Sequence, residues 1–330
     1  MKDTLRNKCD LFVDNYNALM KKFKWNYAIN TRLGALLYMM ENRVVDIDAI
    51  NRCGKVIKEN TGVFSQFKDT TKFMTSVMLS LQMDPEAMLK GVVSVYDAMK
   101  KEGFHSSPYL VLAAISIALQ SDPYNYQRLI ISTKNYYDAM KVEHKFITSS
   151  DDYGFAALLA MTDKSVYQAV SEMENCYRIL KEDFSYSNAV QSLSHVLTFS
   201  EEDAASKCKR VVDLYQALKM RKCKFGTGIE LSFLGVTALL QEDIQKLADE
   251  IAETKEYLKS KKSFGYWSIS ATERIMFAVA MVCDDYLNDA KKNTMEMTLA
   301  NNIAGIVLAQ QMATMAAASG AAAAAASGSN

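Results

Sequence analysis

The sequence predicts an all-α protein made of about seven tandem helix hairpins of ~40 residues each, stacked as an α-solenoid. Two landmarks recur in phase along the chain, and a third pattern divides each unit into two helices. A phenylalanine closes each unit, and an acid marks its middle. The phenylalanines are Phe23, Phe64, Phe104, Phe146, Phe184, Phe225 and Phe264, and the acids are Asp46, Asp84, Asp122, Asp163, Asp203, Asp243 and Asp284.

The first helix of each unit, helix A, is apolar nearly all round, as in residues 33–40, 155–161 and 275–282. A helix that is apolar on every side is buried among other helices. The second, helix B, has apolar residues on one face at the spacing of an amphipathic helix. Since no unit can bury helix A alone, we expect neighbouring hairpins to stack on one another.

Taken in order, residues 3–22 form an amphipathic helix that caps the first hairpin. Seven A helices follow, at about 31–40, 70–82, 107–120, 151–161, 187–199, 228–240 and 270–283, with B helices between them. The mid-unit acids stand where each helix B begins, and an aspartate there accepts hydrogen bonds from unpaired backbone N–H groups. Lysines gather where helix B ends and complement the helix dipole.

These elements form a single helical-repeat domain over residues 1–293. Residues 294–317 are expected to form a C-terminal capping helix, and the Ala/Ser/Gly tail at 318–330 is expected to be disordered.

Composition limits the classes of function. Lys plus Arg equals Asp plus Glu, at 38 each, so the chain has no overall field that would attract nucleic acid. The six cysteines are scattered without a metal-ligand spacing, which favours reduced, buried thiols and a cytoplasmic protein that holds no metal or other cofactor. Apolar runs are too short to span a bilayer, and the first residues lack the apolar core of a signal peptide.

The common catalytic motifs are absent from the sequence. The three histidines lie in different parts of the repeat, and His195 falls within an apolar helix A, where a core histidine is expected. No catalytic residue is therefore assigned.

Unusual residues instead collect at the turns from helix B to helix A, an edge that we call the B-to-A edge. The candidate binding residues there are Trp25, Tyr27, His105, Tyr109, Asp151, Asp152, Tyr153, Glu230, Tyr266 and Trp267, beside the lysine clusters. Aromatic side chains beside cations suit recognition of a peptide or another anionic chain. The alternative is that these aromatic residues hold each turn against its own helices.

The phenylalanine-terminated units, the Ala-Ala-rich A helices and the Ala/Ser/Gly tail resemble an uncharacterised all-helical family of Gram-positive bacteria, catalogued as a domain of unknown function. The resemblance implies a bacterial source and no particular activity. Tetratricopeptide, HEAT and armadillo repeats share the helical-hairpin plan, but their signatures do not occur in these units.

Residues 104–115 and 146–159 also look similar to the hairpins of α/α toroids such as prenyltransferase barrels. That resemblance implies a closed ring, an enzyme acting on a small or lipid-like substrate, and candidate acids Asp151, Asp152, Glu230 and Glu273 at one mouth. The glycine-rich turns and Asp-rich motif of those families are missing. The sequence therefore favours a non-catalytic scaffold that holds a protein or peptide partner, with the toroid enzyme as the alternative.

Overall fold

The computed structural model describes residues 1–24, 28–62, 65–228, 230–240 and 242–290. It confirms the all-α prediction, since fourteen α-helices and three short 3-10 helices account for the secondary structure of these residues, and no strand occurs among them. The expected capping helix at 294–317 and the tail at 318–330 lie outside the described residues, as do Trp25, Tyr27 and Phe64.

The helices alternate along the chain as the repeat predicts. Their bounds are α1 (Asp3–Lys22), α2 (Ala28–Met40), α3 (Ile47–Asn60), α4 (Asp69–Ser80), α5 (Pro85–Lys101), α6 (Pro108–Gln120), α7 (Tyr126–Glu143), α8 (Tyr153–Leu159), α9 (Val166–Leu180), α10 (Ser187–Leu197), α11 (Ala204–Met220), α12 (Leu231–Ala238), α13 (Ile244–Ser260) and α14 (Ala271–Ala290). The 3-10 helices are η1 (Pro123–Asn125), η2 (Ser150–Asp152) and η3 (Lys262–Phe264). The even-numbered α-helices are the A helices, and α3 to α13 with odd numbers are the B helices.

The A helices are buried, as their composition predicts. All eight residues of α12 are buried, and so is every residue of α6 from Leu110 to Ala118. A B helix such as α5 buries one face, through Leu89, Val92, Val95, Tyr96 and Met99. The burial of apolar area in the A helices is the main stabilising contribution to this fold.

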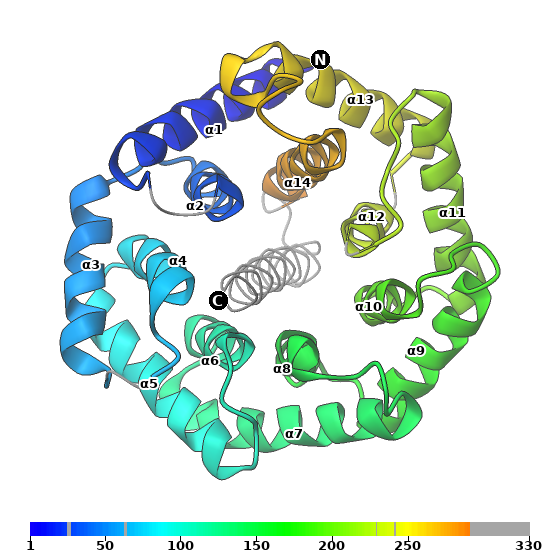
Figure 1. Ribbon diagram of the computed structural model, residues 1–330. Helices are drawn as coiled ribbons and strands as arrows, with labels where there is room; N and C mark the ends of the chain where they lie inside the picture. The colour runs from blue at the N-terminus through cyan, green and yellow to red at the C-terminus, as the bar shows by residue number, and fades with distance from the viewer. Residues whose placement is uncertain (25–27, 63–64, 229, 241, 291–330) are drawn as a thin grey trace, which may run out of the picture. The chain divides into compact units, whose positions relative to one another are not determined.

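The chain forms two compact units. Unit 1 contains Met1–Val13, Val142–Ile147 and the described part of Lys164–Gln310, and unit 2 contains Asp14–Lys141 and Thr148–Asp163. In unit 2, α2, α4, α6 and α8 form one layer, and α3, α5 and α7 form a second layer (Figure 1). In unit 1, α10, α12 and α14 form one layer against α9, α11 and α13 (Figure 1).

The first residues of the chain pack within unit 1 against its last described helices. The ring of Phe12 lies 4.9 Å from that of Phe264 and 5.1 Å from that of Phe277. Lys8 forms a hydrogen-bonded ion pair with Asp284, 276 positions further along the chain. The core of unit 1 therefore includes residues from both ends of its sequence range.

Four of the seven mid-unit acids cap a B helix as predicted. Asp46, Asp84, Asp203 and Asp243 each accept a backbone N–H from the third residue after them, at 2.8–3.0 Å. The other three predictions are wrong. Asp122 makes no capping bond through its side chain, Ser165 caps α9 in place of Asp163, and Asp284 lies buried inside α14 because that helix continues to residue 290.

The phenylalanine landmarks that the structure describes are not all buried. Phe104, Phe184, Phe225 and Phe264 are buried, whereas Phe23 is half-exposed and Phe146 is 95% exposed. In the hairpin that follows Phe146, Tyr153 takes the buried aromatic position instead, and its ring lies 4.9 Å from that of Phe104. The turn before α8 thus uses a tyrosine seven positions later than the phenylalanine period predicts.

Candidate functional site

The structure divides the predicted edge residues between the two units. His105, Tyr109, Asp151, Asp152 and Tyr153 lie in unit 2, and Glu230, Tyr266 and Trp267 lie in unit 1. The remaining two, Trp25 and Tyr27, fall outside the described residues.

In unit 2, Tyr153 holds the turn before α6. Its hydroxyl accepts a hydrogen bond from the backbone N–H of His105 at 3.2 Å, and its ring lies 4.8 Å from the ring of Tyr137. Because Tyr153 is fully buried, it offers no surface to a partner. This residue joins two hairpins of unit 2.

The two aspartates beside it stabilise their own turn. Asp152 accepts the backbone N–H of Ser149 at 2.9 Å, and Asp151 accepts the hydroxyl of the same serine. Burial, with a smaller contribution from the charge of Asp151, raises the pKa of Asp152 well above its ordinary value. Burial and then both carboxyls raise the pKa of Tyr109 to about 12. Tyr109 is therefore protonated at neutral pH and cannot act as a general base there.

In unit 1, Glu230 also forms a hydrogen bond within its own turn. Its carboxylate accepts the backbone N–H of Gly228 at 3.1 Å. A Cβ atom placed on Gly226 would lie 2.6 Å from that carboxylate, so glycine leaves the space into which Glu230 folds. Glu273, another candidate acid, accepts the hydroxyl of Ser270 at 2.9 Å and completes a capping arrangement at the start of α14.

The turn between α13 and α14 differs, because its aromatic side chains face solvent. Tyr266 is 74% exposed and Trp267 is 94% exposed, and their rings meet edge to face at 5.0 Å. Lys262, also exposed, lies in the same turn. We call residues 264–269 the aromatic loop.

A buried arginine fixes the backbone of the aromatic loop. The guanidinium of Arg274 donates to the carbonyl oxygens of Phe264 at 2.8 Å, Gly265 at 3.0 Å and Ile269 at 3.1 Å. Arg274 itself is only 3% exposed. The planar guanidinium suits this task because its donors form a rigid fork. Sequence reasoning missed Arg274, and the available signal was an arginine directly before the apolar run at 275–282.

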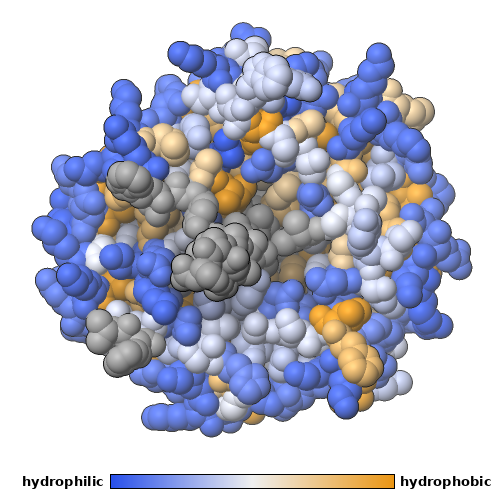
Figure 2. All heavy atoms as spheres, in the orientation of Figure 1, coloured by the Kyte–Doolittle hydropathy of each residue, from blue (hydrophilic) through white to orange (hydrophobic). Residues whose placement is uncertain are grey.

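Figure 2 shows one face of the molecule, where hydrophilic side chains predominate and hydrophobic ones form small separate groups. Against such a surface, two adjacent aromatic rings on a fixed backbone are unusual. Single exposed apolar residues are ordinary in soluble domains.

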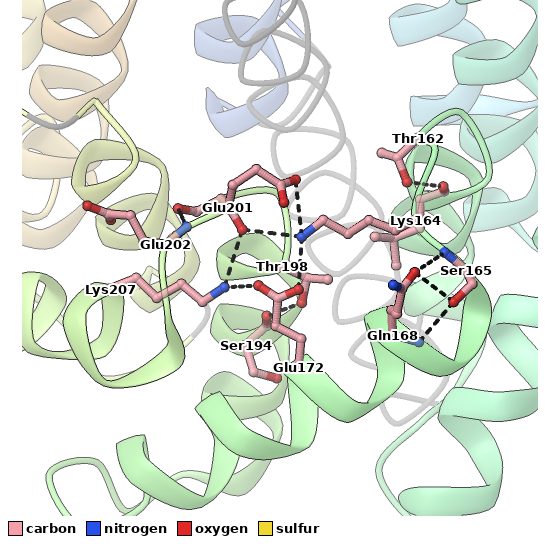
Figure 3. A network of polar contacts seen from close by, with 12 residues as sticks. Thr162, Lys164, Ser165, Gln168, Glu172, Ser194, Thr198, Glu201, Glu202 and Lys207 are labelled. Atoms are coloured by element: carbon pink, nitrogen blue, oxygen red, sulfur yellow. Dashed lines mark hydrogen bonds and ion pairs between the residues drawn. The ribbon is translucent and has the colours of Figure 1, made fainter.

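A second polar centre lies deep in unit 1, where α9, α11 and the connection before α11 meet (Figure 3). Glu172 forms ion pairs with Lys207 and, at 2.9 Å, with Lys164. Both ammonium groups also donate to the carbonyl oxygen of Ser200, Lys164 at 3.3 Å and Lys207 at 3.4 Å.

Burial, and then the charge of Lys164, lower the pKa of Lys207 to about 8. The Glu172 carboxylate in contact favours the charged form of the same ammonium. Since Lys207 is 1% exposed, it is not placed to meet a substrate. Its contacts tie three segments together, and we regard this centre as structural.

Sequence reasoning also missed a groove in unit 2. It is lined by residues of α3 and α4, by Lys22 at the end of α1 and by Phe23, and its volume is about 880 Å³. Lys55 and Lys58 line it from one face of α3. Their spacing of three residues was a signal for a cationic helix face, but the approach of α4 could not be read locally.

Together, the buried A helices and the one-sided B helices define an all-α helical-repeat protein. Residues 15–312 match the family described as protein of unknown function (DUF4003), and the chain belongs to that family. It is also 25% identical to the uncharacterized protein YeaA of Bacillus subtilis (strain 168) over 328 residues, which covers 95% of this chain and 94% of that protein. No solved structure matches the chain significantly. In the part of the chain that the structure describes, no helix is both long and apolar enough to cross a membrane.

Proposed function

We propose that this chain is a non-catalytic binding protein that holds a protein or peptide partner through the aromatic loop. The observation that carries the proposal is the pair formed by Tyr266 and Trp267, which are exposed although Arg274 fixes the loop beneath them. Tyrosine and tryptophan are the side chains most enriched among residues that dominate binding energy at protein interfaces. A fixed backbone reduces the entropy that such residues lose on binding.

The charge around the loop favours an acidic partner. Lys262, two residues before the loop in η3, is exposed, and among the described residues it forms no ion pair. Lys261, one position earlier, pairs with Asp10 at 2.6 Å and so adds little net charge. A partner segment with an apolar residue for the rings and a carboxylate for Lys262 fits this surface.

The alternative, a toroid enzyme, would require free acids at the turns. Its candidates Asp152, Glu230 and Glu273 each accept hydrogen bonds from the backbone or hydroxyl groups of their own turns. These contacts account for the carboxylates as parts of the fold. The binding hypothesis is therefore the better supported of the two.

The test uses a photo-crosslinking amino acid in the full-length chain, expressed in its native host. Placed at position 267, it should capture a defined partner. Placed at position 167, where the tyrosine is 83% exposed on α9, it should not. The Tyr266→Ala/Trp267→Ala variant should release that partner, whereas Tyr167→Ala should retain it. Equal capture at both positions, or full retention by the double variant, would refute the aromatic loop as the binding site.

A further inference from the structure

The groove of unit 2 concentrates positive charge. Five cationic side chains line it, namely Lys22, Arg52, Lys55, Lys58 and Lys72, against two carboxylates, Asp48 and Asp69. The chain as a whole has equal numbers of cationic and acidic residues. The excess at this groove is therefore local, and the rest of the chain carries a compensating excess of acids.

The four lysines of the groove lack the partners that other lysines have. On B helices elsewhere, Lys134 pairs with Asp138 and Lys209 with Asp213, each at one helical turn. Among the described residues, no carboxylate forms an ion pair with Lys22, Lys55, Lys58 or Lys72. Arg52 is different, since it approaches Asp46 at 3.9 Å. Like charges gathered without partners repel one another, and an anion between them would relieve that repulsion.

The groove has an apolar side and a close-packed floor. The ring of Phe23, half-exposed, lies 5.2 Å from the buried ring of Phe73. On the floor, α3 presents Gly54 to α4, and a Cβ atom there would approach the hydroxyl of Ser76 to 3.3 Å. The hollow thus combines a ring face with surrounding ammonium groups.

We propose that this groove binds a small organic polyphosphate, with its phosphates on the lysines and its apolar part against Phe23. Lysine binds phosphate as a compact positive charge. The volume of about 880 Å³ falls within the range of pockets that take small molecules, roughly 300–1,000 Å³. This site lies in unit 2 and is independent of the aromatic loop, which belongs to unit 1.

Isothermal titration calorimetry of the full-length protein at low salt separates the contributions of the phosphates and of the organic part to the affinity. Three probes are used: ATP, inorganic tripolyphosphate and adenosine. ATP should bind most tightly, tripolyphosphate more weakly, and adenosine not measurably, because phosphate charge supplies most of the affinity. A failure of ATP to bind would overturn the proposed site, and equal affinity for ATP and tripolyphosphate would overturn the proposal that the ligand has an organic part. Displacement of ATP by an equal concentration of an acidic peptide would point to a peptide site instead.

Charge-reversal variants test the location. Lys55→Glu/Lys58→Glu should weaken ATP binding by roughly a hundredfold, since each lysine that bonds a phosphate contributes about tenfold or more. The matched control is Lys90→Glu/Lys101→Glu, which reverses two exposed lysines of α5 that do not line the groove. Control binding should stay within about twofold of wild type. Equal weakening in the control would show that binding follows overall charge, which would refute the site.

A conservative double variant distinguishes loss of binding from loss of folding. Lys55→Arg/Lys58→Arg keeps both charges and should keep ATP binding, and all variants should melt within a few degrees of wild type because both side chains are exposed. Phe23→Ala should weaken ATP binding several-fold and leave tripolyphosphate binding unchanged. If it weakened both ligands equally, the ring would have no specific role and the assignment of an organic ligand would be wrong.

Discussion

Replacing Arg274 by lysine tests whether the aromatic loop is held in place from beneath. The guanidinium donates three hydrogen bonds to backbone carbonyls on both sides of Tyr266 and Trp267. A lysine ammonium at the end of a flexible stem cannot reproduce that fork. We expect it to keep one of the three bonds and leave two carbonyls without a charged donor.

The expected loss follows from those two bonds. A hydrogen bond to a charged group contributes about 1.5–3 kcal/mol, and part of that is recovered where water reaches the loop. We therefore expect Arg274→Lys to lower the free energy of unfolding by about 3 kcal/mol. Urea denaturation monitored by circular dichroism measures this change.

The same variant should loosen the loop before the helices. Hydrogen exchange of the amides in residues 264–270 should become faster by about a hundredfold, since the local opening becomes easier by about 3 kcal/mol. Amides in the buried core of α10 exchange through global unfolding, so they should become faster with the loss of stability, whereas amides that open locally at other turns should exchange as in wild type.

Arg210 supplies the matched control for this variant. It too donates to backbone carbonyls of unit 1, those of Ala238 at 3.1 Å and Glu242 at 3.0 Å, but at a different turn. Arg210→Lys should destabilise the chain comparably while leaving exchange at residues 264–270 unchanged. If Arg274→Lys left the loop as protected as in wild type, the idea that the arginine fixes it would be refuted.

Three further predictions concern buried ionisable groups and one close-packed turn. Burial lowers the pKa of His195 to about 3. Because the unfolded chain takes up the proton first, the free energy of unfolding should fall as pH drops below about 6.5, by about 2 kcal/mol at pH 5. In urea denaturation measured over this pH range, His195→Gln should remove most of that dependence on pH. Burial raises the pKa of Asp152, so the contribution of this carboxyl group to stability becomes unfavourable as pH rises above about 4. Asp152→Asn should therefore raise the thermal midpoint of unfolding at pH 7 but not at pH 3.5. A lower midpoint at both pH values would contradict this. Gly226→Ala should displace the Glu230 carboxylate and break its hydrogen bond to Gly228, lowering the free energy of unfolding by about 1 kcal/mol. Gly62→Ala, whose Cβ atom would meet no atom within 4 Å, should lower the free energy of unfolding by less.

Local patterns predicted the helices well because burial and capping are local consequences of sequence. The expected A helices at 70–82 and 107–120 match α4 and α6 within about two residues, the usual uncertainty of helix ends. Aspartate caps were also predictable, since Asp84 bonds a group only three residues away. Periodicity failed at Asp284, because the chain does not turn there and its partner, Lys8, lies far away in sequence.

The candidate site was predictable only in part. Composition identified Tyr266 and Trp267 as unusual, but it could not show that they are exposed whereas Tyr153 is buried. That difference depends on which turns fold back onto neighbouring helices. Of the groove lysines, the sequence pattern singles out only Lys22, as a complement to a helix dipole. The convergence of Lys55, Lys58 and Lys72 with it requires α3, α4 and the end of α1 to be brought together.

The contact of Phe12 with Phe264 and Phe277 has a consequence for how unit 1 assembles. During synthesis, the first thirteen residues leave the ribosome long before α13 and α14 exist, so their apolar faces stay without their native neighbours for most of translation. Closing so long a stretch of chain is slow compared with forming a hairpin. In this unit the docking of residues 1–13 therefore cannot precede the synthesis of α13 and α14, and the newly made chain has a long period in which a chaperone could protect those residues.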